Sequence, residues 1–100
     1  MKYYVLETTM VREAYKSPDF KTALAGHMQF VKQQYADGLI LFSGTKPDNS
    51  GGIRVLKIAD DANVDAYWQL DPMTAAGLLT YRVSAFTPLE VDDAANRRFN

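Results

Sequence analysis

Residues 39–58 read LILFSGTKPDNSGGIRVLKI, and this stretch decides the fold. Its apolar runs at Leu39–Gly44 and Ile53–Ala59 predict two strands. Between them, residues 46–52 combine a proline, an aspartate, an asparagine and two glycines, a composition that is typical of turns. Two strands joined in this way predict an antiparallel hairpin with a long loop in the middle of the chain.

A strand and a helix are predicted before the hairpin. Residues 2 to about 9 are rich in aromatic and β-branched side chains, which favours a strand. Residues 17–19, Ser-Pro-Asp, form a helix-start signal, because serine can cap, proline fits the first turn and aspartate suits the positive end of the helix dipole. The helix runs to about Ala36 and stops at Gly38, and a start near Thr22 is the alternative.

A second helix and a last strand are predicted after the hairpin. One of the two aspartates at positions 60 and 61 caps a helix from Ala62 to about Leu70. Because Asp71 precedes a proline, its backbone avoids the helical region, and the Asp71-Pro72 pair should end that helix. The apolar segment Leu78–Phe86 predicts the last strand.

The resulting order βαββαβ predicts an α+β fold of the ferredoxin-like kind, in which two helices cover one face of an antiparallel sheet. With 100 residues, the chain has room for one domain. We assign residues 1–88 to this domain and residues 89–100 to a polar C-terminal tail that allows one short helix at Asp92–Phe99.

The apolar pattern of the strands also predicts a partner subunit. A sheet covered on one face should alternate apolar and polar residues. Four stretches are instead apolar at consecutive positions: residues 3–6, 39–42, 78–79 and 85–86. Because the second face would otherwise be a large exposed apolar patch, we expect a second copy to cover it in a symmetric homodimer. Scattered surface hydrophobics are the alternative.

Composition excludes several classes of function. The 11 basic and 12 acidic residues give a net charge of -1, so we expect no nucleic-acid or anionic-membrane partner. Without cysteine there is no disulfide, thiolate zinc site or cysteine nucleophile. The N-terminal residues lack a signal-peptide core, and no apolar run approaches the ~20 residues of a membrane span. We therefore expect a cytoplasmic protein.

His27, the only histidine, is the first candidate for chemistry. In the predicted helix the residues Leu24, Met28, Val31 and Tyr35 form one apolar stripe, and His27 lies at its edge. Gly26 beside it is unfavourable in a helix and would allow a close approach of backbone or ligand.

Asp71 is the second candidate, because Pro72 fixes the backbone that carries its carboxylate. A carboxylate can accept one imidazole N–H and leave the other nitrogen free as a general base or acid. From the residues alone two ordinary roles stay open: His27 as a boundary side chain with a neighbouring partner, and Asp71 as a helix terminator and cap.

The remaining polar and aromatic residues give weaker signals. Lys46, Arg54 and Arg82 could bind an anionic substrate, but solvated surface charge is the favoured interpretation. Aromatic side chains at positions 67, 68 and 81 could line a pocket, with core packing as the default. One histidine with scattered carboxylates predicts no metal site, and no cofactor is implied.

Several short motifs in a fixed order resemble the YciI-like (YCII-related) family over about residues 2–88. They are Gly26-His27-Met28-Gln29-Phe30, the segment 37–44 from Asp37 to Gly44, then Pro47, Gly51-Gly52-Ile53, Asp71-Pro72-Met73, Ala76-Gly77-Leu78 with Tyr81, and Phe86-Thr87-Pro88. The resemblance implies a dimeric α+β barrel with an active site of one histidine, His27, and one aspartate, Asp71.

The same resemblance places four residues at the substrate: Gly44, Pro47, Met73 and Tyr81. Met73 stands where the family has phenylalanine after Asp-Pro, and the residues 44–47 replace a common Gly-Pro, so the pocket wall and the loop differ from the family pattern.

We predict a small enzyme without a cofactor that performs lyase or isomerase chemistry on a small aromatic or enolisable metabolite, with His27 as base or acid and Asp71 as its orienter. The alternative is a non-catalytic dimeric module that binds a small molecule or a protein. An oxygen-using monooxygenase on the same type of barrel is a third, more distant hypothesis.

Overall fold

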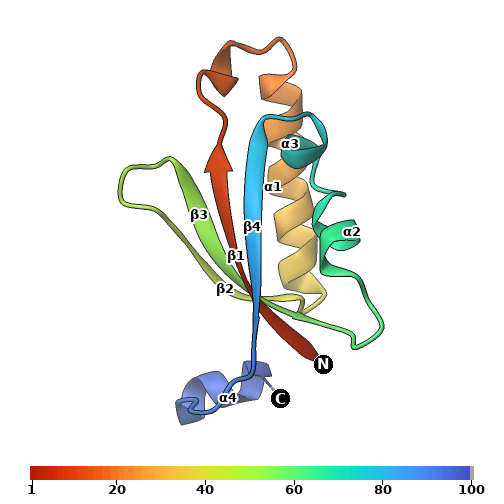
Figure 1. Ribbon diagram of the computed structural model, residues 1–100, viewed down its shortest axis with the longest axis vertical. Helices are drawn as coiled ribbons and strands as arrows, with labels where there is room; N and C mark the ends of the chain where they lie inside the picture. Colours follow the sequence, from red (N-terminus) through yellow and green to blue (C-terminus); the bar gives the residue numbers. More distant parts are fainter. Residues whose placement is uncertain (100) are drawn as a thin grey trace.

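The computed structural model describes residues 1–99 and contains one antiparallel sheet with helices (Figure 1). In chain order the elements are β1 (Lys2–Met10), a 3₁₀ turn (Ala14–Lys16), α1 (Phe20–Ala36), β2 (Ile40–Thr45), β3 (Gly51–Ile58), α2 (Val64–Trp68), α3 (Pro72–Ala75), β4 (Leu79–Phe86) and α4 (Asp93–Phe99). None of the helices in this described part combines the length and the apolar character that a membrane crossing needs.

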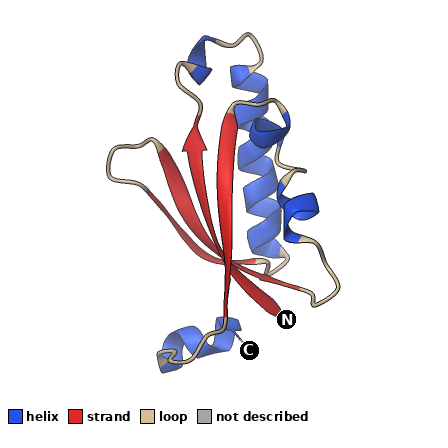
Figure 2. Cartoon of the chain, viewed as in Figure 1, coloured by secondary structure: helices blue, strands red, loops and turns tan. Residues whose placement is uncertain are grey.

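The strand order β2-β3-β1-β4 confirms the predicted α+β class. β3 pairs antiparallel with both β1 and β2, so β1 and β2 run in the same direction and α1 connects them across the sheet. The helices α1, α2 and α3 lie on one side of the sheet (Figure 2). We call that side the helix face and the opposite side the open face.

The predicted helix start at residues 17–19 is early by about two residues. α1 begins at Phe20, close to the alternative start near Thr22, because the Ser17 side chain accepts a hydrogen bond from the backbone of Asp19 in a turn that precedes the helix. The predicted end is confirmed. Ala36 is the last helical residue, and Gly38 has a φ of 77°, a left-handed conformation that glycine adopts without strain.

The predicted helix at Ala62–Leu70 is present in shorter form as α2, and a further short helix that was not predicted, α3, follows it at Pro72–Ala75. Asn63, rather than residue 60 or 61, caps α2 by accepting from the Ala66 N–H. The Asp71-Pro72 pair starts α3 instead of only ending the helix before it. An Asp-Pro pair suits both places, because proline fits the first helical position and the preceding aspartate can cap.

The inward face of α1 also differs from the predicted stripe. Met28 is 64% exposed and Tyr35 is 37% exposed. The residues that pack toward the sheet are Ala23, Leu24, His27, Phe30 and Val31, at the i, i+3, i+4 spacing of a helix face. His27 therefore lies in the middle of the buried face of α1, not at its edge.

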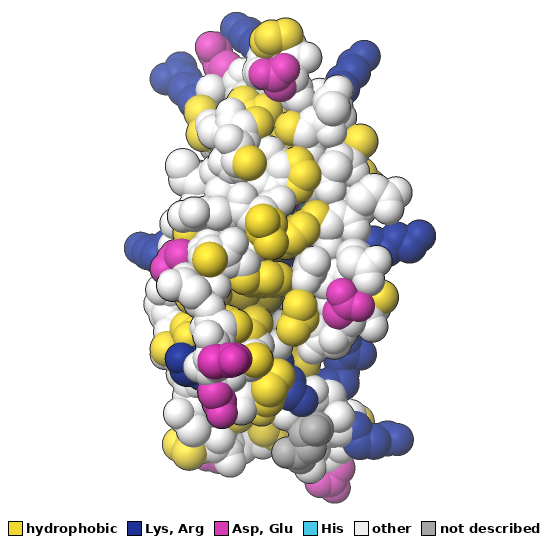
Figure 3. Space-filling model, turned by 90° about the vertical axis from the view of Figure 1, so that its right-hand side faces the viewer, with side chains coloured by type: hydrophobic (Ala, Val, Ile, Leu, Met, Phe, Trp, Pro, Cys, Tyr) yellow, Lys and Arg dark blue, Asp and Glu magenta, His cyan; other side chains and the backbone are white. Residues whose placement is uncertain are grey.

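The helices and the sheet enclose one apolar core. Its fully buried members are Leu6, Ile40, Leu56, Ile58, Trp68 and Met73. The view onto the helix side shows hydrophobic side chains gathered along the middle of that side, with charged side chains toward its margins (Figure 3).

Part of the apolar pattern that suggested a second covered face comes from local irregularities. The register between β2 and β3 shifts between Ile40 and Phe42, so that the consecutive residues Ile40 and Leu41 are both buried within the chain. Leu78 lies just before β4 and is buried with Leu79. The open face nevertheless leaves Val5 37%, Phe42 57% and Ile53 44% exposed.

The short helix predicted in the tail is present as α4, and Asn100 lies outside the described residues. α4 packs against Tyr3 at one end of the open face, where the Tyr3 hydroxyl donates to the Phe99 carbonyl at 2.8 Å. The rings of these two residues are stacked with centroids 5.7 Å apart. The tail therefore covers only one end of the open face.

Candidate active site

The predicted contact between His27 and Asp71 is present. His27 projects from α1 and Asp71 caps α3, and Nδ1 of the imidazole lies 2.6 Å from Oδ1 of the carboxylate. The Asp71 side chain is fully buried, whereas the His27 side chain is 16% exposed. The carboxylate thus lies behind the imidazole, and only the imidazole reaches open space.

Hydrogen bonds keep the Asp71 carboxylate ionised despite its burial. Its second oxygen, Oδ2, accepts from the Thr74 N–H at 3.0 Å and from the Thr74 hydroxyl at 2.8 Å. Burial raises the pKa of Asp71, but the hydrogen bonds from His27 and Thr74 outweigh it, and the pKa lies below its ordinary value. An ionised carboxylate only accepts, so the proton of a neutral imidazole lies on Nδ1, and Nε2 is an unprotonated acceptor with Nη2 of Arg54 at 3.5 Å.

A glycine allows the helices that carry these two side chains to approach each other. A Cβ atom at Gly26 would lie 2.8 Å from Cγ of Pro72, a distance that side chains do not adopt. Gly26 precedes His27 on α1, and Pro72 follows Asp71 on α3. The close approach at this point therefore brings the imidazole and the carboxylate together.

His27 opens onto a cavity of about 340 Å³, which is in the size range of small-molecule sites. Its wall comes from α1, α3, all four strands and the β2–β3 loop. The lining residues are Thr8, Met10, Leu24, His27, Ser43, Gly44, Thr45, Asn49, Gly51, Gly52, Arg54, Met73 and Leu79. Two of the predicted substrate-binding residues, Gly44 and Met73, are among them.

The structure does not bring the other two predicted substrate residues to this cavity. Pro47 is exposed in the loop between β2 and β3. Tyr81 lies on β4, where its hydroxyl donates to Asp65 at 2.7 Å. The default interpretation of two further aromatic residues is confirmed, since Trp68 is fully buried in the core and Tyr67 packs against it.

Arg54 is a site residue that the sequence interpretation assigned to the solvated surface, and that interpretation is wrong. Its side chain is half-buried on the helix face of β3 and lines the cavity. Its Nη2 atom lies 3.5 Å from Nε2 of His27, and its guanidinium carbon lies 5.3 Å from the centre of the Trp68 ring. A guanidinium that projects from a strand toward the core is commonly stabilised by such a contact with an aromatic ring.

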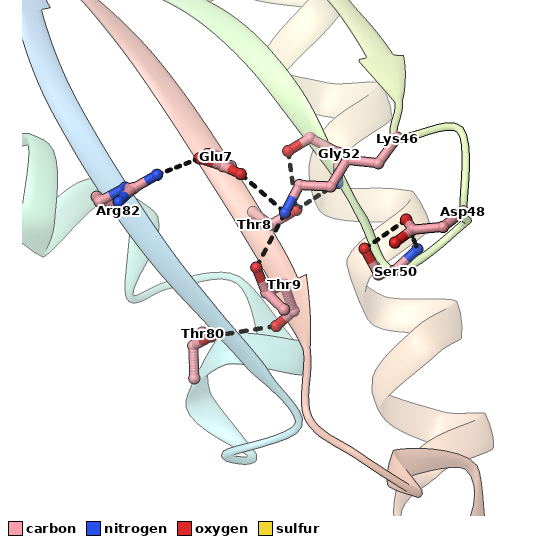
Figure 4. A network of polar contacts seen from close by, with 9 residues as sticks. All are labelled: Glu7, Thr8, Thr9, Lys46, Asp48, Ser50, Gly52, Thr80 and Arg82. Atoms are coloured by element: carbon pink, nitrogen blue, oxygen red, sulfur yellow. Dashed lines mark hydrogen bonds and ion pairs between the residues drawn. The ribbon is translucent and has the colours of Figure 1, made fainter.

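The other two basic candidates belong to a separate cluster on the open face. Lys46 lies 2.9 Å and Arg82 lies 2.7 Å from the carboxylate of Glu7 (Figure 4). The ammonium group of Lys46 also donates to the Thr9 hydroxyl. Glu7, Lys46 and Arg82 are not among the described residues that line the cavity of His27, so the two sites are separate.

Within residues 1–99, no three side chains of histidine, cysteine, aspartate or glutamate gather in a way that could hold a metal ion. The chemistry that the residues themselves can supply is proton transfer. A fixed carboxylate holds the imidazole and can stabilise its charged form, and the unprotonated ring nitrogen can accept a proton beside a cavity.

Fold and site together define a small α+β domain that holds a buried histidine–carboxylate pair beside a cavity for a small molecule. The chain matches the family model of the YCII-related domain over residues 1–87. It belongs to this family, which confirms the resemblance of its motifs.

Among solved structures, the chain is similar to 5-chloro-2-hydroxyhydroquinone dehydrochlorinase from Burkholderia phenoliruptrix AC1100, in a complex with 2,5-dihydroxybenzoquinone. The two share 17% sequence identity, with a TM-score of 0.64 over 85% of this chain and 93% of that one. At this identity the likeness shows the fold. No curated protein sequence matches the chain.

Proposed function

We propose that this protein is a small enzyme in which His27 acts as general base and acid on a small aromatic or enolisable molecule, with Asp71 as its orienter and no cofactor. The single observation that carries the proposal is the 2.6 Å contact between Nδ1 of His27 and a fully buried carboxylate, with the imidazole opening onto a cavity. The dehydrochlorinase of the same fold, bound to a quinone, makes this class of substrate the first to test.

The proton pathway follows from the hydrogen bonds. Nε2 of His27 takes a proton from a carbon beside a carbonyl or from an enolic or phenolic hydroxyl, and the electron pair of the broken bond stays on the substrate as an enolate or phenolate. Asp71 remains ionised and stabilises the imidazolium through Nδ1. The imidazolium then returns the proton at another position, which is isomerisation, or the electron pair expels a leaving group, which is elimination.

The experiment is a deuterium-exchange assay by ¹H NMR in D₂O. The panel consists of 2,5-dihydroxybenzoquinone and small enolisable ketones, and the variant is His27→Gln. We expect the wild type to accelerate exchange at one class of carbon, and His27→Gln to lose that acceleration while keeping the circular dichroism of the fold. Equal acceleration by wild type and His27→Gln would refute the role of His27.

The non-catalytic binding module is the alternative outcome of the same panel. A binder shifts its own NMR signals with a panel compound and leaves that compound unexchanged and unconverted. Binding without exchange or turnover by any member of the panel would therefore favour the module over the enzyme.

We further propose that the open face is the interface of a homodimer. The support is the exposure of Val5, Phe42 and Ile53 on neighbouring strands between α4 and the Glu7 cluster. Light scattering after gel filtration should give twice the chain mass for the wild type and one chain mass for Phe42→Asp. Met28→Asp, which changes an exposed apolar residue of α1, is the matched control and should stay dimeric. A monomeric wild type would refute the interface.

A further inference from the structure

Arg54 places a positive charge inside the fold without a carboxylate in direct contact with it. In the sheet it is the partner of Leu6, whose side chain is fully buried, and it therefore projects to the helix face. Within residues 1–99 it forms no ion pair, and its buried Nε atom has no hydrogen-bond partner. The charge of Asp71, which lies behind His27, compensates that of Arg54 in part.

The guanidinium stays charged in this position. Burial lowers the pKa of Arg54, and the charge of Asp71 raises it in part. An arginine remains protonated at neutral pH even when its pKa falls, because its unperturbed value is so high. A partly desolvated cation with an unpartnered donor is unfavourable unless an acceptor forms a hydrogen bond with that donor.

The cavity itself provides no competing anion. Apart from His27 and Arg54, its polar lining consists of neutral side chains, which are Thr8, Ser43, Thr45 and Asn49. No aspartate or glutamate of the described chain lines it. No acidic side chain of the described residues at the cavity wall opposes the field of Arg54, and Asp71 behind His27 compensates it only in part, so the cavity favours a negatively charged occupant.

We propose that Arg54 is the anion-recognition residue of this cavity and selects a small organic molecule that carries a carboxylate or an ionised enol oxygen. The guanidinium holds that oxygen with charge-assisted hydrogen bonds. Since Nη2 lies 3.5 Å from Nε2 of His27, the bound oxygen lies beside the proton-accepting nitrogen. The catalytic half of this inference rests on the proposed function, whereas the preference for an anion does not.

The same geometry couples substrate charge to proton transfer. When Nε2 accepts a proton, the imidazolium and the guanidinium are two like charges in contact, which is unfavourable in a desolvated site. A bound anion neutralises one of them. An anionic substrate therefore supports the reaction as well as the binding, and a neutral analogue of the same shape supports neither.

The test uses benzoate and benzamide, two probes of one shape that differ in charge. NMR titrations of the full chain measure their affinities for the wild type, Arg54→Met, Arg54→Lys and Arg82→Met. We expect the wild type to prefer benzoate by roughly ten- to a hundredfold, the usual effect of a hydrogen bond to a charged group. Arg54→Met should lose the preference, and Arg54→Lys should keep part of it, because lysine retains the charge without the planar donor array.

Arg82→Met is the matched control, since Arg82 is 81% exposed and pairs with Glu7 on the open face, and it should keep the full preference. Arg54→Lys keeps the test decisive if the methionine variant does not fold. Equal affinity of the wild type for the two probes, no binding of benzoate at millimolar concentration, or an unchanged preference in Arg54→Met would each overturn the proposal. Because turnover is not measured, this result is independent of the deuterium-exchange assay.

Discussion

The two faces of the sheet each hold one carboxylate with two basic side chains, but the two clusters differ in burial. On the helix face, Asp71 contacts His27 and Arg54 lies beyond it. On the open face, Glu7 contacts both Lys46 and Arg82. The shortest contacts are nearly the same, at 2.6 and 2.7 Å. Distance alone therefore does not distinguish a reactive cluster from a surface one.

Desolvation distinguishes them. The Asp71 side chain is fully buried, whereas Glu7 is 33% exposed and Arg82 is 81% exposed. Water screens the open-face charges, which also neutralise one another. On the helix face the charges are partly removed from water, and Arg54 lacks a direct counter-ion among the described residues. In our proposal only the helix-face cluster binds an anionic ligand. Mutations of the two faces should therefore differ in their effects on reaction rate, stability and ligand preference.

The largest difference between mutations of the two faces should appear in the rate of the exchange reaction. We expect Asp71→Asn to slow the exchange reaction by about 10²–10⁴-fold, since the neutral amide neither selects the tautomer of His27 nor stabilises its imidazolium. Asparagine can still cap α3, so the fold should persist. The measurement is the exchange rate for the best compound of the panel, with Glu7→Gln as the open-face control. A rate loss in Glu7→Gln equal to that in Asp71→Asn would remove the distinction between the faces.

The fold was predictable from the sequence because its signals are local. The turn residues between the two apolar runs predict the hairpin, and Gly38 marks the end of α1. The break at Asp71-Pro72 was predicted, but the start of α3 at Pro72 was not, because an Asp-Pro pair suits both the end of one helix and the start of the next. The Asp71–His27 contact was predicted from carboxylate–imidazole chemistry together with the family resemblance.

Arg54 shows what a sequence cannot supply. β3 has apolar residues at both parities, so the alternation does not say whether Arg54 or its neighbours Ile53 and Val55 face the helices. Pairing with β1 fixes that choice, because Arg54 lies opposite the buried Leu6, and this pairing joins residues far apart in the sequence. The predicted apolar stripe of α1 was wrong for a related reason. Large side chains such as Met28 dominated the pattern, although the smaller Ala23 faces the core.

The next effect concerns how the helix face is assembled. We expect Gly26→Ala to destabilise the fold, because its new Cβ would press on the rigid ring of Pro72. Overpacking costs about 1–3 kcal/mol, and the better helix propensity of alanine returns about 1 kcal/mol. The free energy of unfolding, measured with urea, should therefore fall by up to about 2 kcal/mol.

Gly44→Ala is the control for this change, because nothing lies within 4 Å of the Cβ that it would add. It should alter the free energy of unfolding less than Gly26→Ala does. The His27 ring signals of Gly26→Ala should also shift, since the two helices must separate at the contact. A Gly26→Ala protein as stable as the wild type, with unchanged ring signals, would contradict the close-approach argument.

A smaller effect should appear in acid. The pKa of Asp71 is lower in the folded protein than its ordinary value of 3.8, so the unfolded chain takes up this proton first as the pH falls. The carboxylate therefore contributes its full stabilisation at pH values above 3.8. This stabilisation is lost as the pH falls through the lower pKa that Asp71 has in the folded protein. Thermal unfolding at a series of pH values should show the difference between wild type and Asp71→Asn shrinking below that point. A difference that stays constant would contradict the lowered pKa.

The smallest effect should come from the open face itself. Glu7→Gln removes the anion shared by Lys46 and Arg82, yet exposed ion pairs contribute little to stability and salt screens them. We expect a loss of unfolding free energy smaller than that of Gly26→Ala, which disappears in concentrated salt, and an unchanged preference for benzoate over benzamide. Urea unfolding at low and high salt, together with the probe titration, measures both. A change in the anion preference of this variant would mean that the two clusters are coupled through the sheet, and the assignment of ligand selection to Arg54 alone would have to be revised.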